Sequence, residues 1–282
     1  MTIETAKIVL ERTTLRWSTP RTLNDPFDIQ FDLHIDADQE VVRRMALQKI
    51  WEDYSSPNAR RPRNLLGTMI QRMRMQVPNR DRAWLEESLD GVIDEGFARG
   101  LASLPQLHAD TREELQDHKI LCLTETPESL LMWTHYAGNH TGAVLRFRDV
   151  PGLDSPWSEA REVNYLAEMP MLADEELLSD VMSGRGSFDV ASLLDRIIYT
   201  KSLPFAYERE WRISSGHGRN QRAAYEDVPF GAEELDAVIL GARMSAADRA
   251  MVGRLVRDRY PHAELQQAEL DNRHFRVNIG RA

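Results

Sequence analysis

One run of the chain reads Tyr199-Thr-Lys-Ser-Leu-Pro-Phe-Ala-Tyr-Glu-Arg-Glu-Trp-Arg-Ile213. Its end alternates, with Glu208, Glu210 and Arg212 in one parity and Arg209, Trp211 and Ile213 in the other. As a strand, it places two carboxylates and a guanidinium on one face and apolar residues on the opposite face. Carboxylates two residues apart repel each other, and burial raises the cost of ionising both. The pattern therefore indicates either a solvated face with ion pairs or a site that uses the two acids.

A second run is rich in aromatic and hydrogen-bonding side chains: Leu130-Leu-Met-Trp-Thr-His-Tyr-Ala-Gly-Asn-His-Thr-Gly142. We expect a helix that starts near Thr126 and Pro127 and ends at Gly138, carrying Trp133, His135 and Tyr136. Such a mixture suits a pocket for a flat, polar, heteroaromatic ligand. It also suits a buried aromatic helix end with satisfied histidines, which these residues alone favour.

Two kinds of chemistry are disfavoured by spacing. His135 and His140 are five residues apart and do not share a helix face, and neither Glu-x-x-His nor His-x-x-x-His spacing occurs, so no metal is expected. The Gly-x-Ser-x-Gly turn of many hydrolases is also missing.

Composition narrows the class of protein. The chain has 282 residues, 42% of them hydrophobic, which is enough for a substantial core, and a formal net charge of −10. That charge opposes non-specific attraction to nucleic acid or to an anionic membrane. The start, Met1-Thr-Ile-Glu-Thr5, lacks the features of a signal peptide, and no apolar run is long enough to span a bilayer. The single cysteine, Cys122, is flanked by apolar residues and is expected to be buried. We expect a soluble, cytoplasmic protein of bacterial type, without a membrane partner.

The order of apolar periodicities predicts an α+β fold with a mixed, mainly antiparallel sheet. A helix is expected over residues 4–11, strands over 14–18, 119–125, 142–148 and 208–213, a central strand over 234–241, and a closing hairpin over 264–279. Residues 38–117 read as a helical insertion of three helices within a single domain, 1–282. The turn from Thr22 to Asp28 contains Asn24 and Asp25 before Pro26, and is either structural or ligand-facing.

Arginine is concentrated in one part of the insertion. Between Arg60 and Arg82 there are seven arginines against one acid, Asp81, a local charge of +6. Such a block either grips phosphates or an acidic partner, or forms a solvated helix face, which is the commoner case. RNA binding through Arg60–Arg82 is the least favoured of the functions considered.

Four segments together resemble an uncharacterised bacterial family, domain of unknown function 2971 (DUF2971). They are Thr14-Leu-Arg-Trp-Ser18 with Leu23-Asn-Asp-Pro-Phe-Asp28, Leu130–Ala137 with His140 and Gly142, Tyr199-Thr-Lys201, and Tyr207-Glu-Arg-Glu-Trp-Arg-Ile213. The order of these motifs is also similar to that of ADP-ribosyltransferases, in which a split sheet grips NAD. That resemblance implies an NAD-dependent ADP-ribosyltransferase-like enzyme, acting on an unknown macromolecule or small molecule, in a toxin or phage-defence setting.

The resemblance also implies residue roles. Glu210 corresponds to the glutamate that stabilises the oxocarbenium-like transition state, and Glu208 orients the acceptor or tunes Glu210. Tyr136 is the aromatic residue that stacks on nicotinamide, and Trp133, His135 and His140 shape its pocket. The remaining candidates for nucleotide contacts are Ser18, Asn24, Asp25, Lys201 and Arg212.

One departure from the transferase pattern favours an alternative. Related sequences open with a strand bearing a Tyr/His motif, by analogy the holder of the adenine-side ribose. Here the first expected helix, residues 4–11, follows Met1 almost directly, so this strand is missing. The alternative is a non-catalytic module of the same fold that binds a nucleotide or a protein.

Overall fold

The computed structural model describes residues 1–56 and 60–282. The chain divides into two compact units. Unit 1 comprises Met1–Gln30, Leu115–Ala167 and Ile198–Ala282, and unit 2 comprises Phe31–Glu114 and Glu168–Ile197. None of the helices in these described ranges is both long enough and apolar enough to cross a bilayer.

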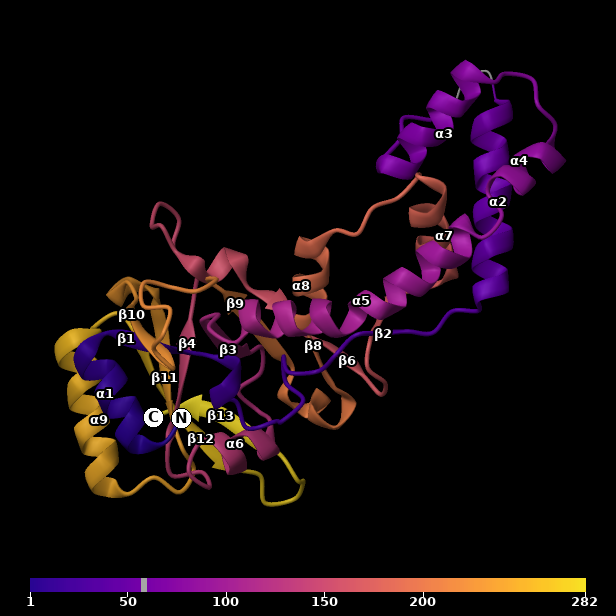
Figure 1. The fold of residues 1–282 in the computed structure, drawn as a ribbon. Coiled ribbons are helices and arrows are strands. Elements are labelled where there is room, and N and C mark those ends of the chain that lie inside the picture. Colours follow the sequence, from indigo (N-terminus) through magenta and orange to yellow (C-terminus); the bar gives the residue numbers. More distant parts are fainter. Residues whose placement is uncertain (57–59) are drawn as a thin grey trace. The chain divides into compact units, whose positions relative to one another are not determined.

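Unit 1 is built on two sheets (Figure 1). The five-stranded sheet is antiparallel, in the order β10 (Tyr225–Pro229), β1 (Thr14–Ser18), β3 (Ile120–Thr124), β9 (Glu210–Ser214), β5 (Arg161–Glu162). The four-stranded sheet runs β13 (Val277–Arg281), β12 (Glu264–Leu270), β11 (Leu235–Leu240), β4 (Ala143–Phe147), and only its β11–β12 pair is parallel. The expected α+β class and the closing hairpin are therefore confirmed, and β11 is central as predicted.

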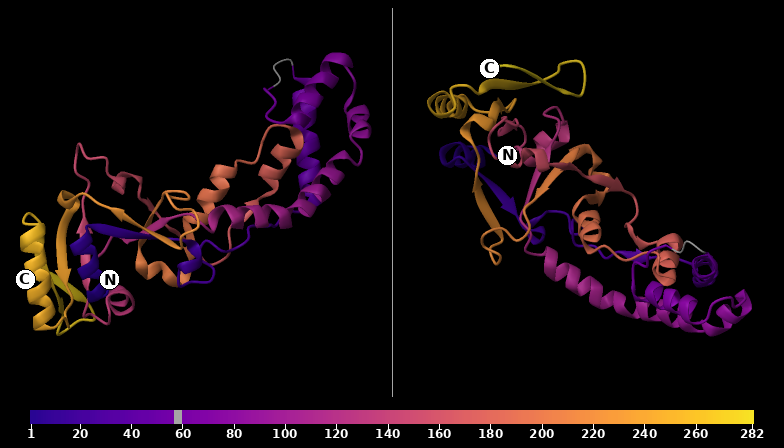
Figure 2. Two further views of the ribbon diagram at one scale, coloured as in Figure 1. Left: turned by 60° about the vertical axis from the view of Figure 1, so that its left-hand side comes forward. Right: turned by 90° about the horizontal axis from the view of Figure 1, so that it is seen from above.

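Helices α1 (Ile3–Arg12) and α9 (Ala246–Arg259) lie side by side, in Figure 1 and in both views of Figure 2. Their apolar faces enter a large core cluster of unit 1, which includes Leu10, Val238 and Val252. Strands β6 (Asn164–Leu166) and β8 (Thr200–Ser202) form a short parallel pair, and β8 carries Lys201. The 3-10 helix η3 (Leu203–Glu208) connects β8 to β9. Three further 3-10 helices are η1 (Pro20–Thr22), η2 (Pro156–Glu159) and η4 (Ala232–Glu234).

Two expected boundaries in unit 1 are wrong for local reasons. The helix expected from Thr126 is α6 (Leu130–Tyr136), because the side chain of Ser129 caps it by accepting from the backbone N–H of Met132. The strand expected from Glu208 starts at Glu210, because Arg209 adopts a left-handed conformation with φ 46° that ends η3. Glu208 therefore belongs to the turn before β9.

Unit 2 is mostly helical. It contains α2 (Gln39–Ser55), α3 (Leu65–Gln76), α4 (Arg82–Ser88), α7 (Glu175–Ser183), nearly all of α5 (Val92–Leu115) and α8 (Val190–Ile198), and a parallel strand pair, β2 (His34–Ile35) and β7 (Met171–Ala173). The described residues of the range 38–117 form four helices where three were expected, because the chain breaks at Gly91, which has φ 74°. Helix α7 packs on α2 (Figure 1), so residues 168–197 belong to the same unit. The single-domain organisation with an insertion over 38–117 stays a prediction.

Candidate functional site: a buried charge cluster beside a cavity

Lys201 lies at the centre of a cluster of buried ionisable groups in unit 1. Only 5% of the residue is exposed. Its Nζ lies 2.6 Å from Glu208 Oε2, 2.9 Å from Glu210 Oε2 and 3.3 Å from Asp28 Oδ2. Desolvation lowers the pKa of Lys201, but the carboxylates of Glu210, Asp28 and Glu208 outweigh it and hold the pKa above the ordinary value. The ammonium group is therefore charged and binds three acids at once.

Arg212 is the second cation of the cluster and is fully buried. Its guanidinium donates from Nε to Glu210 Oε1 at 2.7 Å and from Nη2 to Glu210 Oε2 at 3.0 Å. Nη2 also donates to Asp28 Oδ2 at 2.8 Å, and Nη1 donates to the backbone carbonyl of Ile198 at 2.7 Å. This fork fixes Asp28, from the turn before unit 2, against strand β9.

Glu210 is ionised and fully engaged. Desolvation raises the pKa of Glu210, but the hydrogen bonds and charge of Arg212 and the charge of Lys201 have the larger effect. The pKa is therefore lowered to about 2. Both carboxylate oxygens are occupied by these cations, and the residue is 3% exposed. Its backbone N–H donates to the Tyr165 hydroxyl at 2.8 Å. Glu210 is therefore a buried residue of the site, and cations bind both of its carboxylate oxygens.

The charges in the cluster do not balance. Three carboxylates, of Asp28, Glu208 and Glu210, face two cations, so one negative charge is left over when all are ionised. Burial is the largest cause acting on Asp28, and it raises the pKa of this carboxyl despite Arg212 and Lys201. A buried, imbalanced cluster costs stability relative to apolar packing, and such clusters concentrate at functional sites.

Tyr136 joins this cluster to the surface. Its hydroxyl donates to Glu208 Oε1 at 2.7 Å and accepts from Asn24 Nδ2 at 3.2 Å. Burial and the negative charge of Glu208 raise the pKa of the phenol, so the proton stays on Tyr136. The residue is 37% exposed. The two sequence runs singled out at the start thus meet in one chain of hydrogen bonds.

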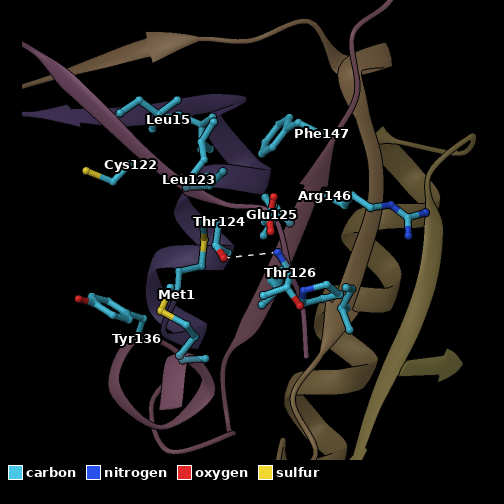
Figure 3. Close-up of a pocket in the computed structure, with 18 of the residues that line it drawn as sticks. Met1, Leu15, Cys122, Leu123, Thr124, Glu125, Thr126, Tyr136, Arg146 and Phe147 are labelled. Carbon is cyan, nitrogen blue, oxygen red and sulfur yellow. Dashed lines mark hydrogen bonds between the residues drawn. The ribbon is translucent and has the colours of Figure 1, made fainter. Parts of the chain in front are cut away.

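A cavity of about 590 Å³ lies next to Tyr136 (Figure 3). Strands β1 and β3 pair only at Ser18 and Ile120, and the cavity is lined by residues of both strands beyond that pair. Strand β4 and helices α1 and α6 contribute further lining residues, among them Trp133 of α6. Labelled lining residues include Leu15, Cys122, Thr124, Tyr136 and Phe147. The volume lies in the range of small-molecule sites, roughly 300–1,000 Å³.

The other candidates on the second run do not join the cluster. Trp133 is 1% exposed and packs in a core cluster, and its indole N–H donates to the Pro127 carbonyl at 2.6 Å. The ring of His140 stacks on it with centroids 6.2 Å apart, and its Nε2 lies 3.3 Å from Thr134 Oγ1. His135 is exposed, with its ring 6.2 Å from that of Tyr207.

The first loop contributes unevenly. Asn24 reaches Tyr136, whereas Asp25 is buried and accepts from the backbone N–H of Phe27 at 2.9 Å. Ser18 pairs with Ile120 in the sheet and does not line the cavity.

Two residues of the site, Asp28 and Cys122, were not among the candidates predicted from the sequence. Asp28 closes the cluster, and its signal was an acid directly after Pro26-Phe27 in the motif already quoted. The prediction that Cys122 is buried is wrong. The strand alternation turns it away from Leu121 and Leu123, toward the face of its partner Arg212, where it is exposed at the cavity. Desolvation by the surrounding protein and the charge of Glu210 nevertheless raise the pKa of its thiol.

The fold and this cluster define an α+β protein with a deeply buried ionic network behind a cavity wall. Residues 132–213, which carry Tyr136, Lys201 and both glutamates, match a family described as protein of unknown function (DUF2971). No curated protein matches the chain. No solved structure matches it either, so the resemblance to ADP-ribosyltransferases stays a prediction.

Proposed function

We propose that unit 1 binds a nucleotide, with a flat polar ring placed against Tyr136 in the cavity. The observation that carries this proposal is the position of Tyr136, which lines the cavity and is hydrogen-bonded to Glu208 of the buried cluster. A half-exposed ring held rigidly by two hydrogen bonds is a preorganised stacking surface. The buried charged groups, through Glu208, fix the orientation of the Tyr136 ring before any ligand binds.

Binding of NAD, ADP-ribose and AMP to the full chain is measured by calorimetry. Stacking on an aromatic ring contributes about 1–3 kcal/mol, so Tyr136→Ala is expected to weaken binding by about tenfold or more. The matched control is Tyr225→Ala, because Tyr225 is an exposed tyrosine of the same unit that does not line the cavity. Absence of binding by all three ligands at millimolar concentration overturns the proposal.

A second candidate, ADP-ribosyl transfer from NAD, is favoured by one further observation. Glu208 and Glu210 share the ammonium of Lys201 and are linked to the tyrosine that would stack on nicotinamide. A carboxylate near developing positive charge stabilises the transition state more than the ground state. It ranks second because Arg212 and Lys201 already occupy both oxygens of Glu210.

Labelled NAD incubated with the protein and cell lysate tests this candidate, with nicotinamide release as a second readout. Transfer that Glu210→Gln abolishes, while NAD affinity is retained, supports it. Affinity for NAD without release of nicotinamide rejects the transferase and leaves the binding module.

A further inference from the structure

Helix α3 of unit 2 presents an apolar, basic face that none of its own packing uses. On one side, Ile70 is buried among α2, α4 and α5, with Leu66 and Met73 packed against the same cluster. On another, Gly67 lies so close to Gly184 that a Cβ on Gly67 would meet the Gly184 carbonyl oxygen at 2.7 Å. The N-cap side chain of Asn64 donates to the carbonyls of Val181 and Gly186 at 2.8 and 2.9 Å. The helix is therefore held firmly in unit 2.

The face left outward consists of Leu65, Met69, Arg72 and Met75, called here the α3 face. Positions three and four apart lie together on a helix surface, so these side chains form one patch. The exposed fractions are 76% for Leu65, 53% for Met69 and 73% for Met75. Three large apolar side chains exposed together on one short helix are a feature of interaction surfaces.

The surroundings of the α3 face are strongly basic. Arg61 and Arg63 precede the helix and are exposed, as is Arg72. Within the part of the chain that the structure describes, these three arginines make no ion pair. By contrast, Arg82 is bonded to Glu86 and Gln48, and Arg80 lies over the ring of Trp84. The free positive charge therefore gathers beside the apolar patch, in a chain whose net charge is −10.

We propose that the α3 face is a docking surface for an acidic, amphipathic helix of a partner protein. Apolar residues of the partner pack on Leu65, Met69 and Met75, and its flanking carboxylates pair with Arg61, Arg63 and Arg72. Methionine suits such a surface because its flexible, polarisable side chain adapts to different apolar partners. A single-stranded nucleic acid is less suited, because its bases stack on aromatic side chains and the α3 face contains none.

The test uses fluorescence anisotropy with the full chain. The probe is a labelled helical peptide of about 20 residues, or about 30 Å, with leucines along one face and glutamates elsewhere. An isomer of the same composition, with its leucines spread around the helix, is the control peptide. The amphipathic peptide is expected to bind at least about tenfold more tightly, since a few packed anchors dominate such interfaces.

Matched variants locate the site. Met69→Ser and Arg72→Ser are each expected to weaken peptide binding by about tenfold. Met169→Ser and Arg99→Ser replace exposed residues of the same types elsewhere in unit 2 and are expected to leave it unchanged. Circular dichroism checks that each variant is folded.

Three results overturn the proposal. The first is equal affinity for the two peptides, which indicates charge attraction alone. The second is no effect of Met69→Ser. The third is tighter binding of single-stranded RNA or of phosphatidylserine vesicles than of the peptide, lost in Arg72→Ser and retained in Met69→Ser, which assigns the surface to phosphate recognition.

Discussion

Replacing Lys201 by Met removes the one group that contacts all three carboxylates of the cluster. Asp28, Glu208 and Glu210 then face Arg212 alone, and the formal charge of the cluster changes from one negative charge to two. The groups are at most 5% exposed, so water screens them little. Leaving a buried charge without its partner typically costs about 3–5 kcal/mol. We expect the free energy of unfolding at pH 7 to fall by about 4 kcal/mol.

The loss is expected to depend on pH. Without the ammonium group, the folded-state pKa of a cluster carboxyl rises above its value of about 4 in the unfolded chain. A group with a raised folded pKa stabilises the protein below its unfolded pKa, and this contribution disappears as pH rises through the folded value. Lys201→Met is therefore expected to be less damaging at pH 4 than at pH 7. Adding Glu208→Gln restores the original formal charge and is expected to recover part of the loss.

Urea unfolding measures these changes, with tryptophan fluorescence and far-ultraviolet circular dichroism followed together to check for a single transition. The matched control is Lys49→Met. Lys49 also contacts two carboxylates, Glu176 and Asp180, each at 2.8 Å, but their side chains are 65% and 36% exposed. Screening by water limits such pairs to about 1 kcal/mol or less. If Lys201→Met costs no more than Lys49→Met, or costs the same at pH 4 as at pH 7, the buried cluster does not behave as the structure implies.

Three further predictions concern single groups of unit 1. The pKa of Glu210 is about 2, below its value in the unfolded chain. Its contribution to the free energy of unfolding is therefore complete above the unfolded pKa and is lost as pH falls toward 2. Glu210→Gln should flatten the acid limb of a stability–pH curve below about pH 4. Trp133→Phe deletes the hydrogen bond to Pro127 and is expected to lower the free energy of unfolding by about 1–3 kcal/mol, because the carbonyl of Pro127 loses its donor; an unchanged free energy in urea unfolding contradicts that assignment. Cys122 is exposed, but the pKa of its thiol is raised. Its labelling by a thiol reagent at pH 8 should therefore be slower than that of free cysteine and should become faster toward pH 10. Labelling at the rate of free cysteine contradicts the structure.

Local pattern alone was sufficient for several elements of unit 1. Helix α1, strands β1 and β11 and the β12–β13 hairpin lie close to their expected ranges, because each has a regular apolar period and clear end signals. Errors arose where a single residue overrides the pattern. Arg209 in the left-handed region removes Glu208 from strand β9, and Gly91 divides a helical stretch into α4 and α5.

The candidate site was only partly contained in the sequence. Its ionisable groups, above all Glu208, Glu210, Lys201 and Arg212, were identifiable because charged residues inside an apolar segment are costly unless they are paired or used. Which groups meet was decided by the tertiary structure: Asp28 reaches Arg212 from 184 residues away, and Tyr136, not its neighbour Trp133, is hydrogen-bonded to Glu208. Periodicity records which side of an element is apolar, but it does not record which distant element covers that side. Contacts between residues far apart in the sequence depend on how the whole unit packs, so only the tertiary structure shows them.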